Sequence, residues 1–309
     1  MKKELKARIY KAQCIGNVEP IEYMIPYPSM RSLIEGQNIK FSQNVIFSKP
    51  KMTNLDFYKK INQTANWLDS IGFKQKDYIK LTELVFPQTE ILLFAIWQIG
   101  AIAVINSNEN YDDSIKKLKL KNIIHKNINL FDLIKDFPKN FSPKYKPLLD
   151  DDALITFEKG NGIRLSHYNL LVNTSSIQKA LNIRSQTLFS CSLKPKSTSW
   201  AILKAILPIY CGCIYDDIGA EITIGKSNCH YNIRTDLKNI YQYKKNDIAI
   251  CPENGAVLAL GKNPIHLTKF ELIKDQIKIQ GHSLMMGYLD NNLNKKQFYD
   301  SAFFLKLEK

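Results

Sequence analysis

The sequence lacks a long apolar run and a leader. Its most apolar stretch, residues 91–105, is interrupted by Gln98 and Gly100 and is too short to span a bilayer. The basic N-terminus is followed by no apolar segment, so a secretory signal is not indicated. We therefore predict no membrane span and expect a cytoplasmic protein.

Arginine is scarce, although the formal net charge is +14 at pH 7. Lysine supplies nearly all of the positive charge and is scattered along the chain. Because arginine is the usual reader of base edges and of phosphates, its scarcity argues against specific nucleic-acid recognition. A non-specific basic nucleic-acid binder stays open as a weaker alternative, since a basic patch can form in three dimensions. The arginines are Arg8, Arg31, Arg164, Arg184 and Arg234.

The six cysteines include no Cys-x-x-Cys pair. One residue separates Cys211 from Cys213, and both lie in an apolar run typical of a buried turn into a strand. His230 follows Cys229, but one histidine does not complete a zinc site. We expect these cysteines to be small core residues, and we predict no metal site.

The 309 residues, 45% of them hydrophobic, are enough for one large domain or two ordinary ones. Between residues 30 and 215, helical periods alternate with short apolar strands. This pattern predicts an α/β core with a mostly parallel sheet and flanking helices. Over 216–309 the period shortens towards two, which predicts a reduced β-rich subdomain, although 216–250 is hard to interpret. Residues 1–29 are a polar lead-in that we expect on the surface.

Residues 151–170 contain the clearest local signal for a ligand site. A buried strand at 153–157 leads into Lys159-Gly160-Asn161-Gly162, and a helix over 166–183 follows, with Ser166 as its N-cap. Glycines before a helix N-terminus commonly hold a phosphate, because backbone N–H groups and the helix dipole attract the anion. A Gly-x-Gly turn also joins many strands to helices and binds nothing, and local sequence does not separate the two interpretations.

The order of several segments resembles the AMP-forming adenylating ligases, which include acyl- and aryl-CoA synthetases, luciferases and peptide-synthetase adenylation domains. IKIQGHSLMMGYLDNNLNKKQF resembles their late strand and turn, with Gly281, Met286, Gly287 and Tyr288 at the expected positions. SAFFLKLE is similar to the closing signature Gly-Trp-Phe-x-Thr-Gly-Asp. The resembling segments are residues 53–106, 151–173, 192–215, 277–298 and 301–308.

This resemblance implies Mg-ATP-dependent activation of a small carboxylic acid to an acyl-adenylate, followed by transfer to CoA or a carrier protein. It also implies a small C-terminal domain that carries a catalytic lysine. That domain is absent from this sequence, so a separate protein would have to supply it.

The departures from the family fall on the nucleotide site. The family's phosphate loop holds ATP with several hydroxyl groups and a lysine, but no Ser or Thr lies between Phe157 and Ser166 here. Ile218-Gly219-Ala220-Glu221 is the nearest match to Tyr-Gly-x-Thr-Glu, whose glutamate helps to hold magnesium. Glu308 takes the place of the aspartate that binds ribose. A surface turn and a frayed terminus are the alternatives for these two acids.

We therefore predict a ligase homologue with reduced or lost catalysis, and a non-catalytic acyl- or AMP-binding protein is the alternative. ATP or AMP with Mg is expected only if part of the site is retained. No catalytic residue is assigned. The candidate nucleotide-binding residues are Lys159, Gly160, Asn161, Gly162, Arg164, Glu221 and Glu308.

Overall fold

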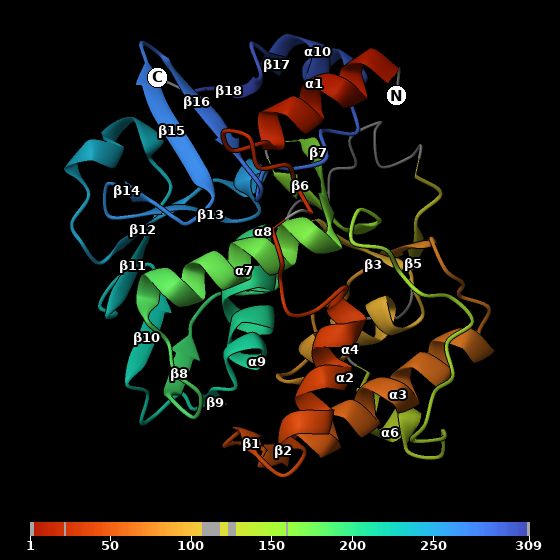
Figure 1. Ribbon diagram of the computed structural model, residues 1–309. Helices are drawn as coiled ribbons and strands as arrows, with labels where there is room; N and C mark the ends of the chain where they lie inside the picture. The colour runs from red at the N-terminus through yellow and green to blue at the C-terminus, as the bar shows by residue number, and fades with distance from the viewer. Residues whose placement is uncertain (1–2, 22, 107–117, 123–127, 159, 308–309) are drawn as a thin grey trace.

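Three β-sheets organise the chain, and helices pack between and around them (Figure 1). The computed structural model describes residues 3–21, 23–106, 118–122, 128–158 and 160–307. Two candidate residues, Lys159 and Glu308, thus lie outside the described residues.

The first sheet is parallel except at one edge, where β6 and β7 form an antiparallel hairpin. Residues 102–105 and 153–157, in two of its inner strands, are buried, mostly apolar runs of the kind expected of strands that are covered on both faces. Its order is β5 (Lys121–Asn122), β3 (Tyr78–Lys80), β4 (Ile102–Asn106), β6 (Asp152–Glu158) and β7 (Asn161–Ser166).

The second sheet has nine strands, with a parallel centre and antiparallel edges. Its order is β14 (Asn263–Pro264), β13 (Val257–Leu260), β12 (Asp247–Ile250), β11 (Tyr231–Arg234), β10 (Ile222–Gly225), β8 (Leu188–Cys191), β9 (Ile214–Tyr215), β1 (Val45–Phe47) and β2 (Met52–Thr53). The part of the sequence that was hard to interpret therefore supplies β10 and β11.

The third sheet is antiparallel throughout and is covered by the N-terminal helix α1 (Lys3–Gln13). Leu5, Ile9 and Ala12 form the buried face of α1, which lies beside β17 and β18 in Figure 1. Residues 3–13 therefore form a packed helix, although the sequence predicted a polar lead-in on the surface. The strand order is β15 (Thr268–Ile273), β16 (Gln276–Gly281), β18 (Ala302–Lys306) and β17 (Phe298–Tyr299).

The helix α3 follows its sequence signals closely, whereas η2, η3 and α10 lie where the sequence predicted no helix. Thr53 and Asp56 have the spacing of a capping box and form one, and Gly72 follows the end of α3 with φ +88°. The helices are α2 (Met30–Phe41), α3 (Asn54–Ser70), α4 (Gln88–Gln98), α6 (Leu130–Ile134), α7 (His167–Leu181), α8 (Thr198–Trp200), the π-helix η1 (Ala201–Ile206), α9 (Leu207–Cys211), the 3-10 turns η2 (Leu237–Gln242) and η3 (Pro252–Asn254), and α10 (Asn291–Gln297).

The helix α7 links the sheets, because it packs on β6, β7 and β13. Its first residues are buried without a break from His167 to Ile177. At its N-terminus, the Asn169 side-chain amide donates to the backbone oxygens of His282 and Leu284, which follow β16. The three sheets are thus joined through one helix and its cap.

The predicted α/β class with a mostly parallel sheet is confirmed. The nine-stranded sheet continues across residue 215, with β9 before it and β10 after it. The expected division of the chain at that residue stays a prediction about folding units. Among the described residues, no helix has the length and apolar character needed to cross a membrane.

Glu90 is a carboxylic acid buried in α4, opposite Trp200 and Lys204. Its Oε2 atom has no hydrogen-bond partner. Burial raises the pKa of Glu90 to about 7, because desolvation disfavours the charged form. The folded state therefore holds this proton more tightly than the unfolded chain does.

We expect the contribution of Glu90 to stability to be present at low pH and to be lost as pH rises from about 4.5 through 7. The loss is about 3 kcal/mol in the free energy of unfolding. In Glu90→Gln this pH dependence should disappear, which denaturant unfolding from pH 4.5 to 8 would measure. Glu271→Gln, an exposed acid on β15, controls for the lost charge. Parallel pH curves for Glu90→Gln and the unaltered protein would contradict a buried, neutral Glu90.

Candidate functional site

The expected phosphate loop is a tight hairpin. Glu158 pairs with Asn161 across β6 and β7, so only two residues form the turn. Gly160 occupies the turn with φ +82°, a conformation that favours glycine. Asn161 and Gly162, which we expected in the loop, instead begin the strand β7. Gly162 thus lies four residues before Ser166, about 13 Å along the strand at roughly 3.3 Å per residue, and Gly160 lies farther still from the helix α7.

The N-terminus of α7 has no free amide at its first three positions. The N–H groups of His167 and Tyr168 donate to the backbone oxygens of Asp151 and Leu149. The N–H of Asn169 donates to Ser166 Oγ, which completes the predicted N-cap. Since these three donors already have acceptors within the protein, they are not available to a phosphate in this structure.

The strand β7 is covered by residues 286–289. Backbone hydrogen bonds join Leu289 N–H to Gly162 O at 2.8 Å, and Met286 N–H to Arg164 O at 2.8 Å. Leu289 packs directly on Gly162, since a Cβ at position 162 would lie 2.4 Å from Leu289 Cδ1. Gly162 is therefore a packing glycine, required because another side chain fills the space above it.

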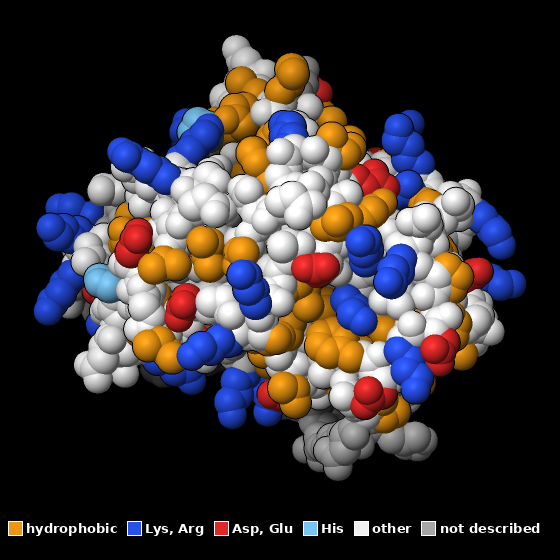
Figure 2. Space-filling model, turned by 90° about the horizontal axis from the view of Figure 1, so that it is seen from below, with side chains coloured by type: hydrophobic (Ala, Val, Ile, Leu, Met, Phe, Trp, Pro, Cys, Tyr) orange, Lys and Arg blue, Asp and Glu red, His pale blue; other side chains and the backbone are white. Residues whose placement is uncertain are grey.

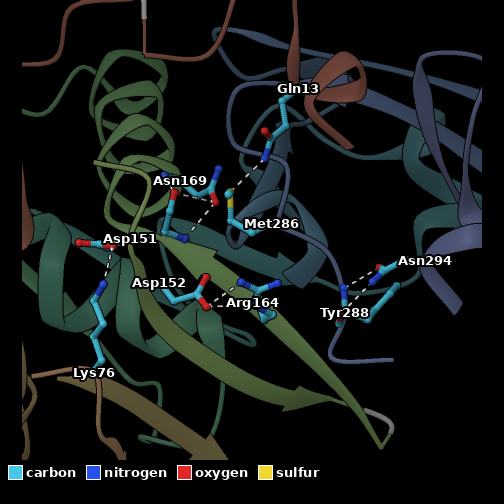
Figure 3. Close-up of polar contacts among 10 residues, drawn as sticks. Gln13, Lys76, Asp151, Asp152, Arg164, Asn169, Met286, Tyr288 and Asn294 are labelled. Atoms are coloured by element: carbon cyan, nitrogen blue, oxygen red, sulfur yellow. Dashed lines mark hydrogen bonds and ion pairs between the residues drawn. The ribbon is translucent and has the colours of Figure 1, made fainter. Parts of the chain in front are cut away.

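Arg164 forms an ion pair with Asp152 on the neighbouring strand. Its Nη2 lies 2.8 Å from Asp152 Oδ2, and Figure 3 shows the two side chains turned toward each other. Both side chains border a cavity of about 250 Å³ that also includes Asp151 and His167. The guanidinium charge is thus balanced by a carboxylate of the protein.

The largest of the cavities identified in the described part of the chain has a volume of about 630 Å³. It lies at the carboxyl ends of the parallel strands β11 and β12, the usual position of ligands in α/β sheets. The hairpin and the last strand of the third sheet complete its wall. The lining residues are Asn161, residues 235–238, residues 250–253, Tyr288, Gln297 and residues 305–307.

Of the candidate residues, Asn161 alone borders this cavity among those that the structure describes. Gly160 lies at the hairpin turn, and Gly162 is buried under Leu289. Glu221 precedes β10, and its N–H donates to Leu188 O at the start of β8. It therefore lies at the amino ends of these parallel strands, whereas the cavity lies at the carboxyl ends of β11 and β12.

The Thr235-Asp236 pair was not among the candidate residues predicted from the sequence. These residues directly follow β11 and line the cavity. A Thr followed by an acid at the end of a strand is similar to the end of Tyr-Gly-x-Thr-Glu, so a search for strand ends could have found them. Asp236 Oδ1 accepts from Lys238 N–H, and Oδ2 accepts from the Asn239 amide at 2.6 Å, which begins the turn η2.

A second acid on the wall, Glu253, gave no sequence signal. The Tyr288 hydroxyl donates to Glu253 Oε1 at 2.9 Å, and Cys251 Sγ lies 3.5 Å from Glu253 Oε2. Burial, reinforced by the charge of Glu253, raises the pKa of both the Cys251 thiol and the Tyr288 hydroxyl. Both groups therefore keep their protons and act as donors to the carboxylate.

Positive charge is not concentrated on the face of the molecule seen in Figure 2. Lysine and arginine side chains lie there in several groups, with hydrophobic and acidic side chains between them. Among the described residues, no group of three or more His, Cys, Asp or Glu side chains is arranged to hold a metal ion.

Comparison with solved structures shows which fold this is. The Klebsiella oxytoca NpsA N-terminal subdomain has a TM-score of 0.69 and 15% identity, covering 92% of this chain and 96% of that one. The anthranilate CoA ligase AuaEII, in complex with anthranoyl-AMP, has a TM-score of 0.71 and 14% identity, covering 92% and 75%. McyG A-PCP complexed with phenylalanyl-adenylate has a TM-score of 0.71 and 14% identity, covering 93% and 75%.

The chain has the fold of the large N-terminal part of adenylate-forming ligases, as the sequence resemblance indicated. A scan of protein-family models finds no match to the sequence, and neither does a search of curated proteins. At 10–15% identity, the solved structures establish the fold alone.

The packing of Leu289 on Gly162 can be tested by a double-mutant cycle. Gly162→Ala should lower the free energy of unfolding by about 1–3 kcal/mol, because the new Cβ overlaps Leu289. Adding Leu289→Ala should relieve the overlap, so the double variant should lose at least about 1 kcal/mol less than the two single losses together. Denaturant unfolding of the four proteins gives this coupling.

Gly160→Ala is the matched control, because a Cβ there meets no atom within 4 Å and Leu289→Ala should not change its effect. Strictly additive losses for the Gly162 and Leu289 variants would show that the two residues do not press on each other.

Proposed function

We propose that this protein is a non-catalytic relative of the adenylate-forming acid–thiol ligases that binds AMP or an acyl-adenylate without forming it. The observation that carries this proposal is the two-residue turn between β6 and β7. In the family that the sequence resembles, the corresponding loop holds the ATP phosphates. Here the turn provides no room for such a loop, and the neighbouring helix N-terminus is capped by its own chain.

The residues present do not fit magnesium triphosphate. No Ser or Thr lies between Phe157 and Ser166, and the hydroxyl of Ser166 is the buried cap of α7. Arg164 is paired with Asp152. Each charge-assisted hydrogen bond lost from a triphosphate site removes about 1.5–3 kcal/mol, so the loss of several would abolish useful affinity for ATP.

The cavity at β11 and β12 fits a monophosphate better. Its volume, about 630 Å³, lies within the range of small-molecule sites. Apolar side chains such as Leu237 and Ile250 alternate with the acid Glu253 and with the amines Lys238 and Lys306. Two solved structures with this fold are complexes with an adenylate, namely phenylalanyl-adenylate in McyG A-PCP and anthranoyl-AMP in AuaEII.

The acid bound to AMP would be a small carboxylic acid, and CoA or a carrier protein would be the acceptor in any complex that transfers it. A separate protein with the small catalytic domain is a further partner of this kind. A cytoplasmic location is part of this proposal, in keeping with cysteines that are buried as small core residues, such as Cys191 and Cys251. The spread of lysines in Figure 2 favours this function over a nucleic-acid binder.

Calorimetric titration with AMP and, separately, with Mg-ATP tests the proposal. We expect AMP to bind at micromolar concentrations and Mg-ATP to bind at least tenfold more weakly, because no group receives the outer phosphates. Tight, magnesium-dependent binding of ATP would contradict the proposal. Binding of neither nucleotide would also reject it.

A pair of lysine variants locates the site. Lys238→Ala should weaken AMP binding several-fold, because an ammonium on the cavity wall attracts the phosphate. Lys262→Ala removes an exposed lysine that follows β13 outside this cavity and should leave AMP binding unchanged. Equal effects of the two variants would indicate a general charge effect in place of a site.

A further inference from the structure

Of the two acids that the structure describes on the cavity wall, Glu253 is the one with an acceptor atom that lacks a strong donor. It follows β12 in the turn η3, and its backbone oxygen accepts from Met285 N–H at 2.8 Å. The Tyr288 hydroxyl holds Oε1 at 2.9 Å. The Tyr288 contact comes from residues 286–289, which also cover β7, so the carboxylate is held by the segment that packs on the hairpin.

The second carboxylate oxygen, Oε2, is the atom available to a ligand. Its partner is the Cys251 thiol at 3.5 Å, and a thiol is a weak donor. Glu253 is half-buried and lines the cavity, so its side chain is within reach of a molecule bound there. A carboxylate oxygen accepts two hydrogen bonds readily, and Oε2 therefore has capacity for a further donor.

Asp236, the other acid of the wall, is engaged differently. Its Oδ1 accepts from Lys238 N–H at 3.2 Å, and its Oδ2 accepts from the Asn239 amide at 2.6 Å. The Tyr243 hydroxyl donates to Asp236 O and fixes the same turn. Asp236 therefore shapes the turn after β11, whereas Glu253 presents an acceptor to the cavity.

We propose that Glu253 binds a hydrogen-bond donor of the nucleoside, either a ribose hydroxyl or the amino group of adenine, and that Tyr288 is the positioning residue that holds Glu253 in place. This inference rests on the proposed binding of AMP. A carboxylate already held by the protein loses little freedom when it accepts the ligand's donor, so the hydrogen bond contributes to affinity with little ordering of the side chain.

Glu253→Gln tests the proposal because it keeps the shape and the acceptor for Tyr288 but replaces Oε2 with a donor. Calorimetry should show AMP binding weakened about tenfold to a hundredfold. The unaltered protein and the variant would then be compared with 2′-deoxy-AMP, 3′-deoxy-AMP and purine riboside 5′-monophosphate, each of which lacks one donor. The nucleotide that lacks the donor bound by Glu253 should have almost the same affinity for the unaltered protein and for Glu253→Gln.

Tyr288→Phe removes the hydroxyl that holds Oε1 and should weaken AMP binding several-fold. If Tyr288 acts by positioning Glu253, this loss of affinity should also vanish for the nucleotide that lacks the donor bound by Glu253. A general packing defect would weaken the binding of all four nucleotides alike. Glu271→Gln is the matched acid control on the exposed face of β15, and thermal melting verifies that each variant is folded.

The outcomes separate the two proposals. If the unaltered protein binds none of the nucleotides, the proposed function fails. If it binds AMP and folded Glu253→Gln binds AMP equally well, or if the variant's loss is the same for every nucleotide, the assignment of Glu253 fails while the proposed function stands. A loss confined to ligands that keep one donor supports the assignment and identifies that donor.

Discussion

The contact on which the candidate site most depends is the packing of residues 286–289 against the strand β7. Backbone hydrogen bonds run in both directions between these segments, and Leu289 occupies the space that any side chain at Gly162 would need. The same segment carries Tyr288, whose hydroxyl holds Glu253 on the cavity wall. One contact therefore fills the space beside the hairpin and, through Tyr288, holds the Glu253 carboxylate on the cavity wall.

The helix α7 connects this region with the rest of the molecule. Asn169, the partner of the N-cap Ser166 in the capping box, accepts from Ser166 N–H and donates to the backbone that follows β16, so the helix N-terminus joins two parts of the protein. The first N–H groups of this helix already have acceptors and are not free for an anion. The chain thus has the fold of adenylate-forming ligases, with a tight hairpin between β6 and β7 beside an occupied helix end.

Local signals predicted much of the fold, since the capping residues Thr53 and Ser166 and the alternation of helices and strands are set by nearby sequence. The strand β7 could not be read in this way, because Gly160 and Gly162 look alike in sequence, although one forms a turn and the other lies under Leu289. The site was predicted poorly for the same reason. Glu253 becomes a binding candidate only through Tyr288, which lies far along the chain and on another segment.

The central claim is that this chain does not form adenylates, and the most direct test is carboxylate-dependent exchange of labelled pyrophosphate into ATP. The purified protein would be assayed with magnesium, ATP and a panel of small carboxylic acids. The short hairpin predicts exchange no faster than in samples without protein. Exchange that depends on a particular acid and saturates with ATP would show that the nucleotide is activated here, and it would contradict this account.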